Sequence, residues 1–217
     1  IISEIATVNT LGGDPLFMAV STVPAVETVD VLKVAFHNAK NVSTSDIKIV
    51  LELDNSLVTD YNAANGTNFA PIPTNAYTLS DPTLEITLPK GTYGEHTLTM
   101  TVTKAALSLT QTYALGFKIK SVSEGVISDL ANNMIFVLGV KNIYDGVYSM
   151  KGYILRAGDP VLTGNFSGLQ YGLITAGPSS VDFHTLQVWG DGQSGVGIGI
   201  PRLTVDPATN NVTVASS

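Results

Sequence analysis

Residues 46–54 read DIKIVLELD, and this stretch decides the fold class of the chain. Its isoleucines and leucines occupy every second position, with Lys48 and Glu52 between them. Successive side chains of an extended strand point to opposite faces, so the stretch predicts a strand with one buried and one solvated face. The same alternation recurs at 83–88 (TLEITL) and 97–103 (TLTMTVT). We therefore expect a protein built from half-buried strands.

The alternation extends over most of the first 140 residues. Further strands are predicted at 16–22, 29–37, 112–122 and 133–140. Residues 89–95, PKGTYGE, are expected to form the turn that joins strands 83–88 and 97–103 as an antiparallel hairpin. This many half-buried strands predicts an immunoglobulin-like β-sandwich of about seven strands.

One segment, residues 54–69 (DNSLVTDYNAANGTNF), breaks the alternation. The residues at helical spacing are Leu57, Tyr61 and Ala64. Asp54 or Asn55 is suited to the N-cap and Gly66 to a left-handed C-cap. We expect a helix of about three turns laid across the end of the sandwich. The following residues 70–82, APIPTNAYTLSDP, are too rich in proline for regular structure and predict an ordered surface connection.

A change in composition near residues 141–145 predicts a domain boundary, since glycine becomes frequent beyond it. The chain is divided into a β-sandwich domain at 1–141 and a small glycine-rich antiparallel β domain at 142–217. Strands of the second domain are predicted at 147–155, 168–174, 181–189, 196–202 and 211–214. The predicted fold class is thus all-β, with one short helix in the N-terminal domain.

Composition excludes several classes of function. The chain has 11 Lys and Arg against 18 Asp and Glu, a formal net charge of −7, so it lacks the basic clusters that bind nucleic acid. It has no cysteine, which rules out a disulfide framework and a thiol nucleophile. The apolar runs are short, so no membrane-spanning segment is expected.

No pattern of catalytic, cofactor-binding or metal-binding residues stands out. The run GVGIGI lacks the spacing of a dinucleotide loop, and GQSGVG lacks the second glycine of a serine nucleophile elbow. The three histidines, His37, His96 and His184, have no partner at metal-ligand spacing. The acidic pairs Glu52 with Asp54 and Glu85 with Glu95 are expected to be solvated surface charges. We predict no enzyme activity, no cofactor and no metal.

Aromatic residues of the second domain are the best candidates for ligand binding. Trp189, the only tryptophan, stands at a strand end before a polar, glycine-rich stretch that contains Asp191 and Gln193. Sugar rings stack their C–H faces on exposed aromatic rings, while carboxylates and amides bind the hydroxyls. These three residues, with Tyr171 or Tyr153, form the predicted site. The simpler alternative is that Trp189 belongs to the core of the domain.

The residues from 54 to 91 also resemble a known family. The matching positions are Tyr61, Asn62, Gly66, Thr67, Pro73, Tyr77, Thr78, Leu79, Pro89 and Gly91. Over about residues 1–140 the sequence resembles an N-terminal β-sandwich domain of unknown function of exported Bacteroidetes surface lipoproteins. Residues 142–154, NIYDGVYSMKGYI, resemble the opening of a second β module common in such proteins.

The resemblance implies a non-catalytic, cell-surface segment for glycan binding or adhesion. It implies export and a lipid anchor, at the cell surface or outer membrane, on a cysteine that has been removed from this segment. The expected partners are a polysaccharide or other cell-surface proteins. Two alternatives remain open: a structural spacer or assembly subunit without a small-molecule ligand, and an accessory module of a longer glycoside hydrolase.

Overall fold

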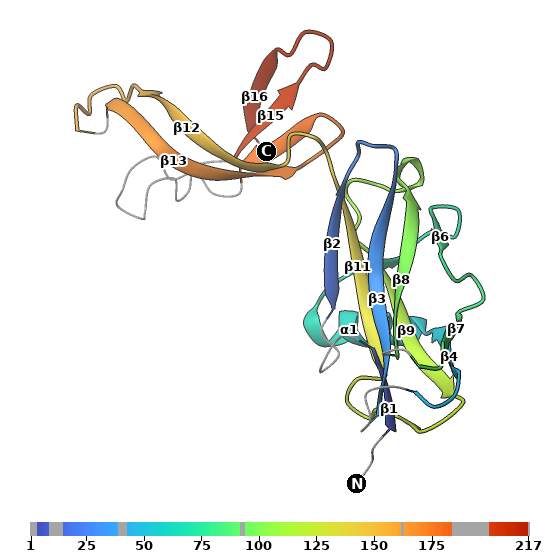
Figure 1. Cartoon of the computed structure of the whole chain (residues 1–217). Coiled ribbons are helices and arrows are strands. Elements are labelled where there is room, and N and C mark those ends of the chain that lie inside the picture. The colour runs from blue at the N-terminus through green and yellow to red at the C-terminus, as the bar shows by residue number, and fades with distance from the viewer. Residues whose placement is uncertain are drawn as a thin grey trace. The chain divides into compact units, whose positions relative to one another are not determined.

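The chain forms two compact units, residues 1–140 and 141–217. The computed structural model describes residues 4–8, 15–38, 43–91, 94–161, 163–183 and 200–216. Strands dominate both units, and one α-helix is present among the described residues (Figure 1). The predicted all-β fold class is therefore confirmed. No helix in the described parts of the chain has the length and apolar character needed to cross a membrane.

The N-terminal unit is a sandwich of two sheets. The first sheet runs, in spatial order, β10 (Val126–Ile127), β1 (Glu4–Val8), β3 (Val26–Asn38), β8 (Gly94–Thr103) and β6 (Tyr77–Leu79). The second runs β2 (Leu16–Ser21), β11 (Asn133–Lys141), β9 (Tyr113–Val122), β4 (Ile47–Leu53) and β7 (Glu85–Leu88), and β5 (Ala70–Pro71) also pairs with β9. A 3-10 turn, Lys104–Ala106, follows β8. The pairs β1–β10 and β5–β9 are parallel.

The core of the sandwich is made by the alternating positions of the two sheets. On β4 these are Ile47, Ile49 and Leu51, and on β8 they are Leu98, Met100 and Val102, all at most 3% exposed. Residues between them, such as Lys48 and Thr99, are exposed or half-buried. The period of two residues therefore separates core from solvent as the sequence predicts.

The predicted hairpin between residues 83–88 and 97–103 is wrong. β7 pairs with β4 in the second sheet, whereas β8 pairs with β3 and β6 in the first. Alternation shows that each strand has one buried face, but a strand in either sheet of a sandwich satisfies that condition. The five residues between β7 and β8 are long enough to cross the roughly 10 Å that separates two packed sheets.

The proline-rich residues 70–82 are more regular than predicted. They contain β5, which pairs with β9, and β6, which pairs with β8 at the edge of the first sheet. These short pairings and β10 bring the sandwich to eleven strands among the described residues, above the expected seven. Proline is tolerated in β5 because this strand is only two residues long.

Helix α1 (Asn55–Asn65) has the predicted caps. Asp54 is the N-cap, and its carboxylate accepts hydrogen bonds from the backbone N–H of Ser56 at 3.0 Å and from its hydroxyl at 2.6 Å. These bonds hold the pKa of Asp54 below its usual value, against a smaller opposing effect of burial. Gly66 ends the helix in the left-handed conformation, with φ of 64°.

The position of α1 differs from the prediction, because the helix packs on the outer face of the second sheet and not across the end of the sandwich. Its buried Val58 contacts Ala114 of β9 and Ile135 and Val137 of β11. Gly116 of β9 explains the close approach, since a Cβ at this position would lie 2.2 Å from the carbonyl oxygen of Asp54. The backbone N–H of Asp54 donates to the Gly116 carbonyl at 2.9 Å.

The described residues of the C-terminal unit form a curled sheet of five strands (Figure 1). In spatial order these are β12 (Gly146–Ile154), β13 (Gly164–Thr175), β14 (Ser180–Phe183), β15 (Pro201–Val205) and β16 (Val212–Ser216). Each described pair is antiparallel. This antiparallel pairing agrees with the predicted antiparallel β module.

We predict that Gly116→Ala destabilises the N-terminal unit, because the new methyl group would clash with the backbone carbonyl of Asp54. Relief of the clash requires that β9 or the start of α1 shift, which costs packing energy. Forced packing of this kind costs about 1–3 kcal/mol. Gly139→Ala is the matched control, since a Cβ at Gly139 of β11 meets nothing within 4 Å. Urea denaturation of both variants checks the difference. Equal stabilities for the two would contradict the close contact.

A second prediction concerns the N-cap of α1. Asp54→Ala should lower the free energy of unfolding by about 1 kcal/mol at neutral pH, whereas Asp54→Asn retains a cap. Because the folded-state pKa of Asp54 is lowered, ionisation stabilises the fold above the unfolded value of 3.8 and is lost as pH falls through the folded value. The deficit of Asp54→Ala should therefore shrink in acid. Thermal unfolding followed by circular dichroism at neutral pH and at about pH 2 tests this, and a deficit independent of pH would refute it.

Candidate functional site

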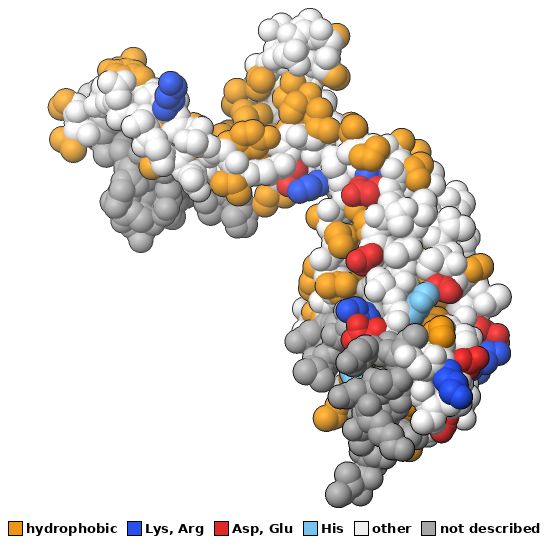
Figure 2. Space-filling model, viewed as in Figure 1, with side chains coloured by type: hydrophobic (Ala, Val, Ile, Leu, Met, Phe, Trp, Pro, Cys, Tyr) orange, Lys and Arg blue, Asp and Glu red, His pale blue; other side chains and the backbone are white. Residues whose placement is uncertain are grey.

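The C-terminal sheet has one apolar and one polar face. Alternation and register place the following side chains on the apolar face: Tyr148, Met150, Leu169, Tyr171, Leu173, Val181, Phe183, Leu203, Val212 and Val214. The other face is mainly polar and carries Ser149, Gln170, Ser180, Asp182, Arg202, Thr204 and Thr213, together with the exposed Val147 and Ile174. Hydrophobic side chains gather over β15 and β16 in Figure 2, where Val214 is 67% exposed.

The long hairpin of β12 and β13 carries exposed apolar side chains near its tip. Tyr153, Leu155 and Val161 are each more than half exposed. The hairpin is held by Gly152, which faces Phe166 across the strand pair. A Cβ at Gly152 would lie 2.7 Å from the ring, so the glycine lets the aromatic side chain cover the opposite backbone.

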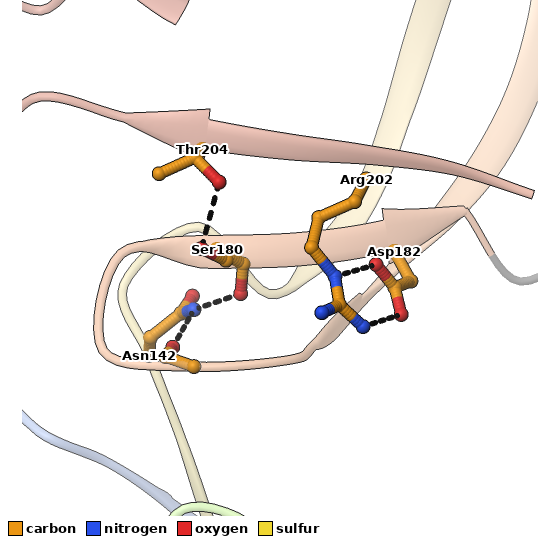
Figure 3. A network of polar contacts seen from close by, with 6 residues as sticks. Asn142, Ser180, Asp182, Arg202 and Thr204 are labelled. Atoms are coloured by element: carbon orange, nitrogen blue, oxygen red, sulfur yellow. Dashed lines mark hydrogen bonds and ion pairs between the residues drawn. The ribbon is translucent and has the colours of Figure 1, made fainter. Parts of the chain in front are cut away.

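A network of hydrogen bonds around Asn142 connects the first residues of the C-terminal unit to the start of β14 (Figure 3). Asn142 is 1% exposed, and its side-chain amide donates to the carbonyl oxygens of Gly177 and Ser180, both at 2.8 Å. Its own carbonyl oxygen Oδ1 accepts from the backbone N–H of Tyr144 at 2.8 Å. Asp145 accepts from the backbone N–H and the hydroxyl of Thr175 at 2.7 and 2.8 Å. The NIYDG motif therefore anchors β12 and β13 to the start of β14.

The polar face of the sheet carries a second set of contacts between β14 and β15 (Figure 3). Arg202 donates two hydrogen bonds to the carboxylate of Asp182, each at 2.8 Å. These bonds lower the pKa of Asp182, against the weaker effect of burial. The hydroxyls of Ser180 and Thr204 are 2.9 Å apart. Both pairs fix the register of the two strands.

The two described tyrosines of the predicted site lie in different environments. Tyr153 is 61% exposed and directly opposite Asn165. Tyr171 is 5% exposed and meets Phe183 edge to face, with ring centroids 5.9 Å apart, so it offers no open ring face. Tyr171 pairs with Tyr148, which is five residues, or roughly 17 Å, from Tyr153 along β12. The structure does not bring the two tyrosines together.

Trp189, Asp191 and Gln193 lie outside the described residues. Their joint role in a ligand site therefore stays a prediction. Of the predicted site, the structure places one open aromatic ring, that of Tyr153, on the surface of the C-terminal unit.

The acidic residues weighed as glycosidase pairs have structural partners. Glu85 lies 2.8 Å from Lys48, Glu95 lies 3.2 Å from Lys33, and Glu52 lies 3.8 Å from Lys120. Asp54 caps α1. Among the described residues, no group of three or more acidic or histidine side chains is placed to hold a metal ion.

Sequence reasoning missed the exposed Leu155 and Val161 and the pair of Asp182 with Arg202. Leu155 and Val161 flank a turn, where a period of two residues carries no information. The ion pair depends on the register of β14 and β15, which the intervening 17 residues conceal. The NIYDG motif was visible, and its Asn and Asp are typical of turns that bond their own backbone.

We predict that Asn142→Ala destabilises the C-terminal unit, because it removes the donor to the half-buried Gly177 carbonyl oxygen and the acceptor of the Tyr144 backbone N–H. The Ser180 carbonyl oxygen keeps the backbone N–H of Ala176 as a donor. The free energy of unfolding should fall by at most about 1–3 kcal/mol for each group left unsatisfied. Asn165→Ala, at an exposed position of β13, is the control and should lower it far less. Native-state hydrogen exchange of β13 and β14 amides measures the local effect. Unchanged protection in Asn142→Ala would show that the network is dispensable.

Comparison with known proteins identifies a matching family and solved structures of similar fold. A family model described as a "-like, N-terminal domain" matches residues 15–126, more than half of the 217 residues. No curated protein matches the sequence. A solved protein of unknown function from Bacteroides ovatus aligns over 98% of this chain and 72% of its own, with a TM-score of 0.57 and 13% identity.

Two further structures share the architecture across both units. A multidomain protein including DUF1735, also from Bacteroides ovatus, aligns over 99% of this chain and 71% of its own, with a TM-score of 0.55 and 13% identity. An auxiliary nutrient binding protein from Bacteroides thetaiotaomicron aligns over 93% and 70%, with a TM-score of 0.50 and 10% identity. At these identities the likeness concerns fold and not ligand. By the family match, the chain belongs to this family of N-terminal domains, and here that domain is followed by a second β module.

Proposed function

We propose that this chain is a non-catalytic glycan-binding or adhesion segment of an exported surface lipoprotein, linked to polysaccharide capture. In this proposal the N-terminal sandwich is a spacer and the C-terminal unit contacts the glycan. The observation that carries it is the exposed ring of Tyr153 on a hairpin held in place by a glycine and an aromatic side chain.

The surroundings of Tyr153 suit a sugar. Its ring is 61% exposed, and the exposed side chain of Asn165 stands directly across the strand pair. An aromatic face binds the apolar C–H groups of a pyranose, and a neighbouring amide exchanges hydrogen bonds with its hydroxyls. Both residues are on strands, so binding would need little ordering of the protein.

Charge and fold narrow the ligand class. The formal net charge of −7 repels polyanionic glycans, which favours a neutral polysaccharide. The similar fold of an auxiliary nutrient binding protein supports a glycan-related role at a coarse level. Export and an anchor at the outer membrane are part of the proposal and follow from the family resemblance.

An assembly role is the second candidate, and the edge of the C-terminal sheet favours it. Among the described residues β16 is the last strand of that sheet, and all five of its residues are exposed. An open edge presents unpaired backbone groups that accept another strand. In this alternative the C-terminal unit joins protein chains and has no glycan ligand.

Binding of soluble neutral polysaccharides, such as mannan, xyloglucan and arabinogalactan, tests the proposal. We expect at least one of them to bind in isothermal titration and to change the fluorescence of Trp189, the only tryptophan. Tyr153→Ala should weaken that binding about tenfold or more, which corresponds to about 1.4 kcal/mol of lost stacking. Tyr148→Ala is the control, because Tyr148 is an exposed tyrosine on the same strand but on the apolar face.

The opposite results are equally clear. Unchanged polysaccharide affinity in Tyr153→Ala would show that the binding site does not include Tyr153. A chain that binds none of the polysaccharides and sediments as an oligomer in analytical ultracentrifugation would replace the proposal with the assembly alternative.

A further inference from the structure

The N-terminal sandwich has a small hollow beside helix α1, far along the chain from the proposed glycan contact. Its volume is about 90 Å³. One side of the helix, at Asn55, Val58, Thr59 and Asn62, forms one wall; Phe69 and Pro71 form the other, and Ala114 of β9 lies in the lining as well. In Figure 1 this is the region where α1 lies against the second sheet.

The volume limits what the hollow can hold. An apolar cavity of about 150 Å³ holds benzene, with six heavy atoms, so about 90 Å³ corresponds to roughly four. Pockets for whole drug-sized ligands run from about 300 Å³ upward. The hollow therefore suits a four-atom group at the end of a larger molecule and not a complete sugar ring.

The lining combines apolar and polar groups. Val58, Phe69, Pro71 and Ala114 are apolar, whereas Asn55, Thr59 and Asn62 present amides and a hydroxyl from successive turns of the helix. The buried Val58 and Ala114 give the hollow an apolar bottom, whereas Asn55, Thr59 and Pro71 are exposed at its rim. A matching group has a methyl at one end and both a donor and an acceptor at the other.

Hydrogen-bonding capacity remains at the polar rim. No described residue hydrogen-bonds the side-chain amide of Asn55, which can donate to a carbonyl. The Thr59 hydroxyl donates to the carbonyl oxygen of Asn55 at 3.2 Å and keeps lone pairs that accept from an N–H. The rim thus offers one donor and one acceptor.

The opposite wall is held rigidly. The Asn62 side chain donates to the Phe69 carbonyl at 3.0 Å and accepts from the Phe69 N–H at 3.0 Å. Tyr61 stacks on the Phe69 ring with centroids 5.9 Å apart, and Phe17 meets it edge to face. A wall fixed before binding reduces the entropy that a ligand must overcome.

We propose that this hollow binds the acetamido group of an N-acetylated hexosamine. The methyl lies against Val58, Phe69 and Ala114, the carbonyl accepts from Asn55, and the N–H donates to Thr59. The site gives the sandwich a binding role beyond that of a spacer, and it does not depend on the glycan contact proposed for the C-terminal unit.

Titration with N-acetylglucosamine, followed by amide NMR of the whole chain, tests the site. We expect a dissociation constant on the order of 1 mM, as suits one small group, with shifts centred on Asn55, Thr59 and Ala114. Glucose, which lacks the acetamido group, should bind at least about tenfold more weakly. Tyr153→Ala should leave these shifts unchanged, which separates this site from the proposed glycan contact.

Thr59→Trp fills the hollow and should abolish the shifts. Asp60→Trp places the same bulk on the neighbouring exposed position of the helix, outside the lining, and should preserve them. The spectra of the unliganded variants serve as the check that both are folded. Equal response to glucose, no response to N-acetylglucosamine, or shifts that persist in Thr59→Trp would each overturn the proposal.

Discussion

The burial of every second residue between two facing sheets is the constraint on which the N-terminal unit depends. Ile49 of β4 and Met100 of β8, each fully buried, come from opposite sheets of this core. Because these inward positions are filled by apolar side chains, the polar groups of the sandwich lie on its outer surface. The only α-helix among the described residues then packs outside the second sheet, where Ala114 and Gly116 leave room for it.

The C-terminal unit is stabilised differently. Tyr171 and Val181 are the only buried apolar residues among those described in its strands, and much of its order comes from polar contacts. Asn142 and Asp145 tie three strands together near the start of the unit, and Arg202 ties β15 to β14. A sheet built in this way keeps large side chains such as Tyr153 at its surface without a deep core beneath them.

The sequence predicts those features that are local. Strand β4 and the capped helix α1 follow from alternation, from Asp54 and from Gly66, all within a short stretch of chain. The sheet to which a strand belongs depends on partners far away in the sequence, so the local pattern predicts one hairpin for β7 and β8 although they lie in different sheets. The strands β5 and β6 exist only because β9 and β8 supply their hydrogen bonds, which no local pattern records.

The candidate site shows the same limit. Tyr153 and Tyr171 both stand in strands that mix apolar and polar residues, and nothing near either one tells which face is covered. The contact of Tyr171 with Phe183 settles the matter for that ring, but it requires the pairing of β13 with β14. Surface chemistry on such a sheet is therefore readable from sequence only after the register is known.

The parallel pair of β1 and β10 has a consequence for the order in which the chain can fold. Ile5 pairs with Val126, 121 positions later in the sequence. At a synthesis rate of about 5–20 residues per second, β10 leaves the ribosome roughly 6–24 s after β1. During that interval β1 can pair only with β3, and its other edge stays open to strands from neighbouring chains. The nascent sandwich is thus most exposed to misassembly before residue 127 has been made.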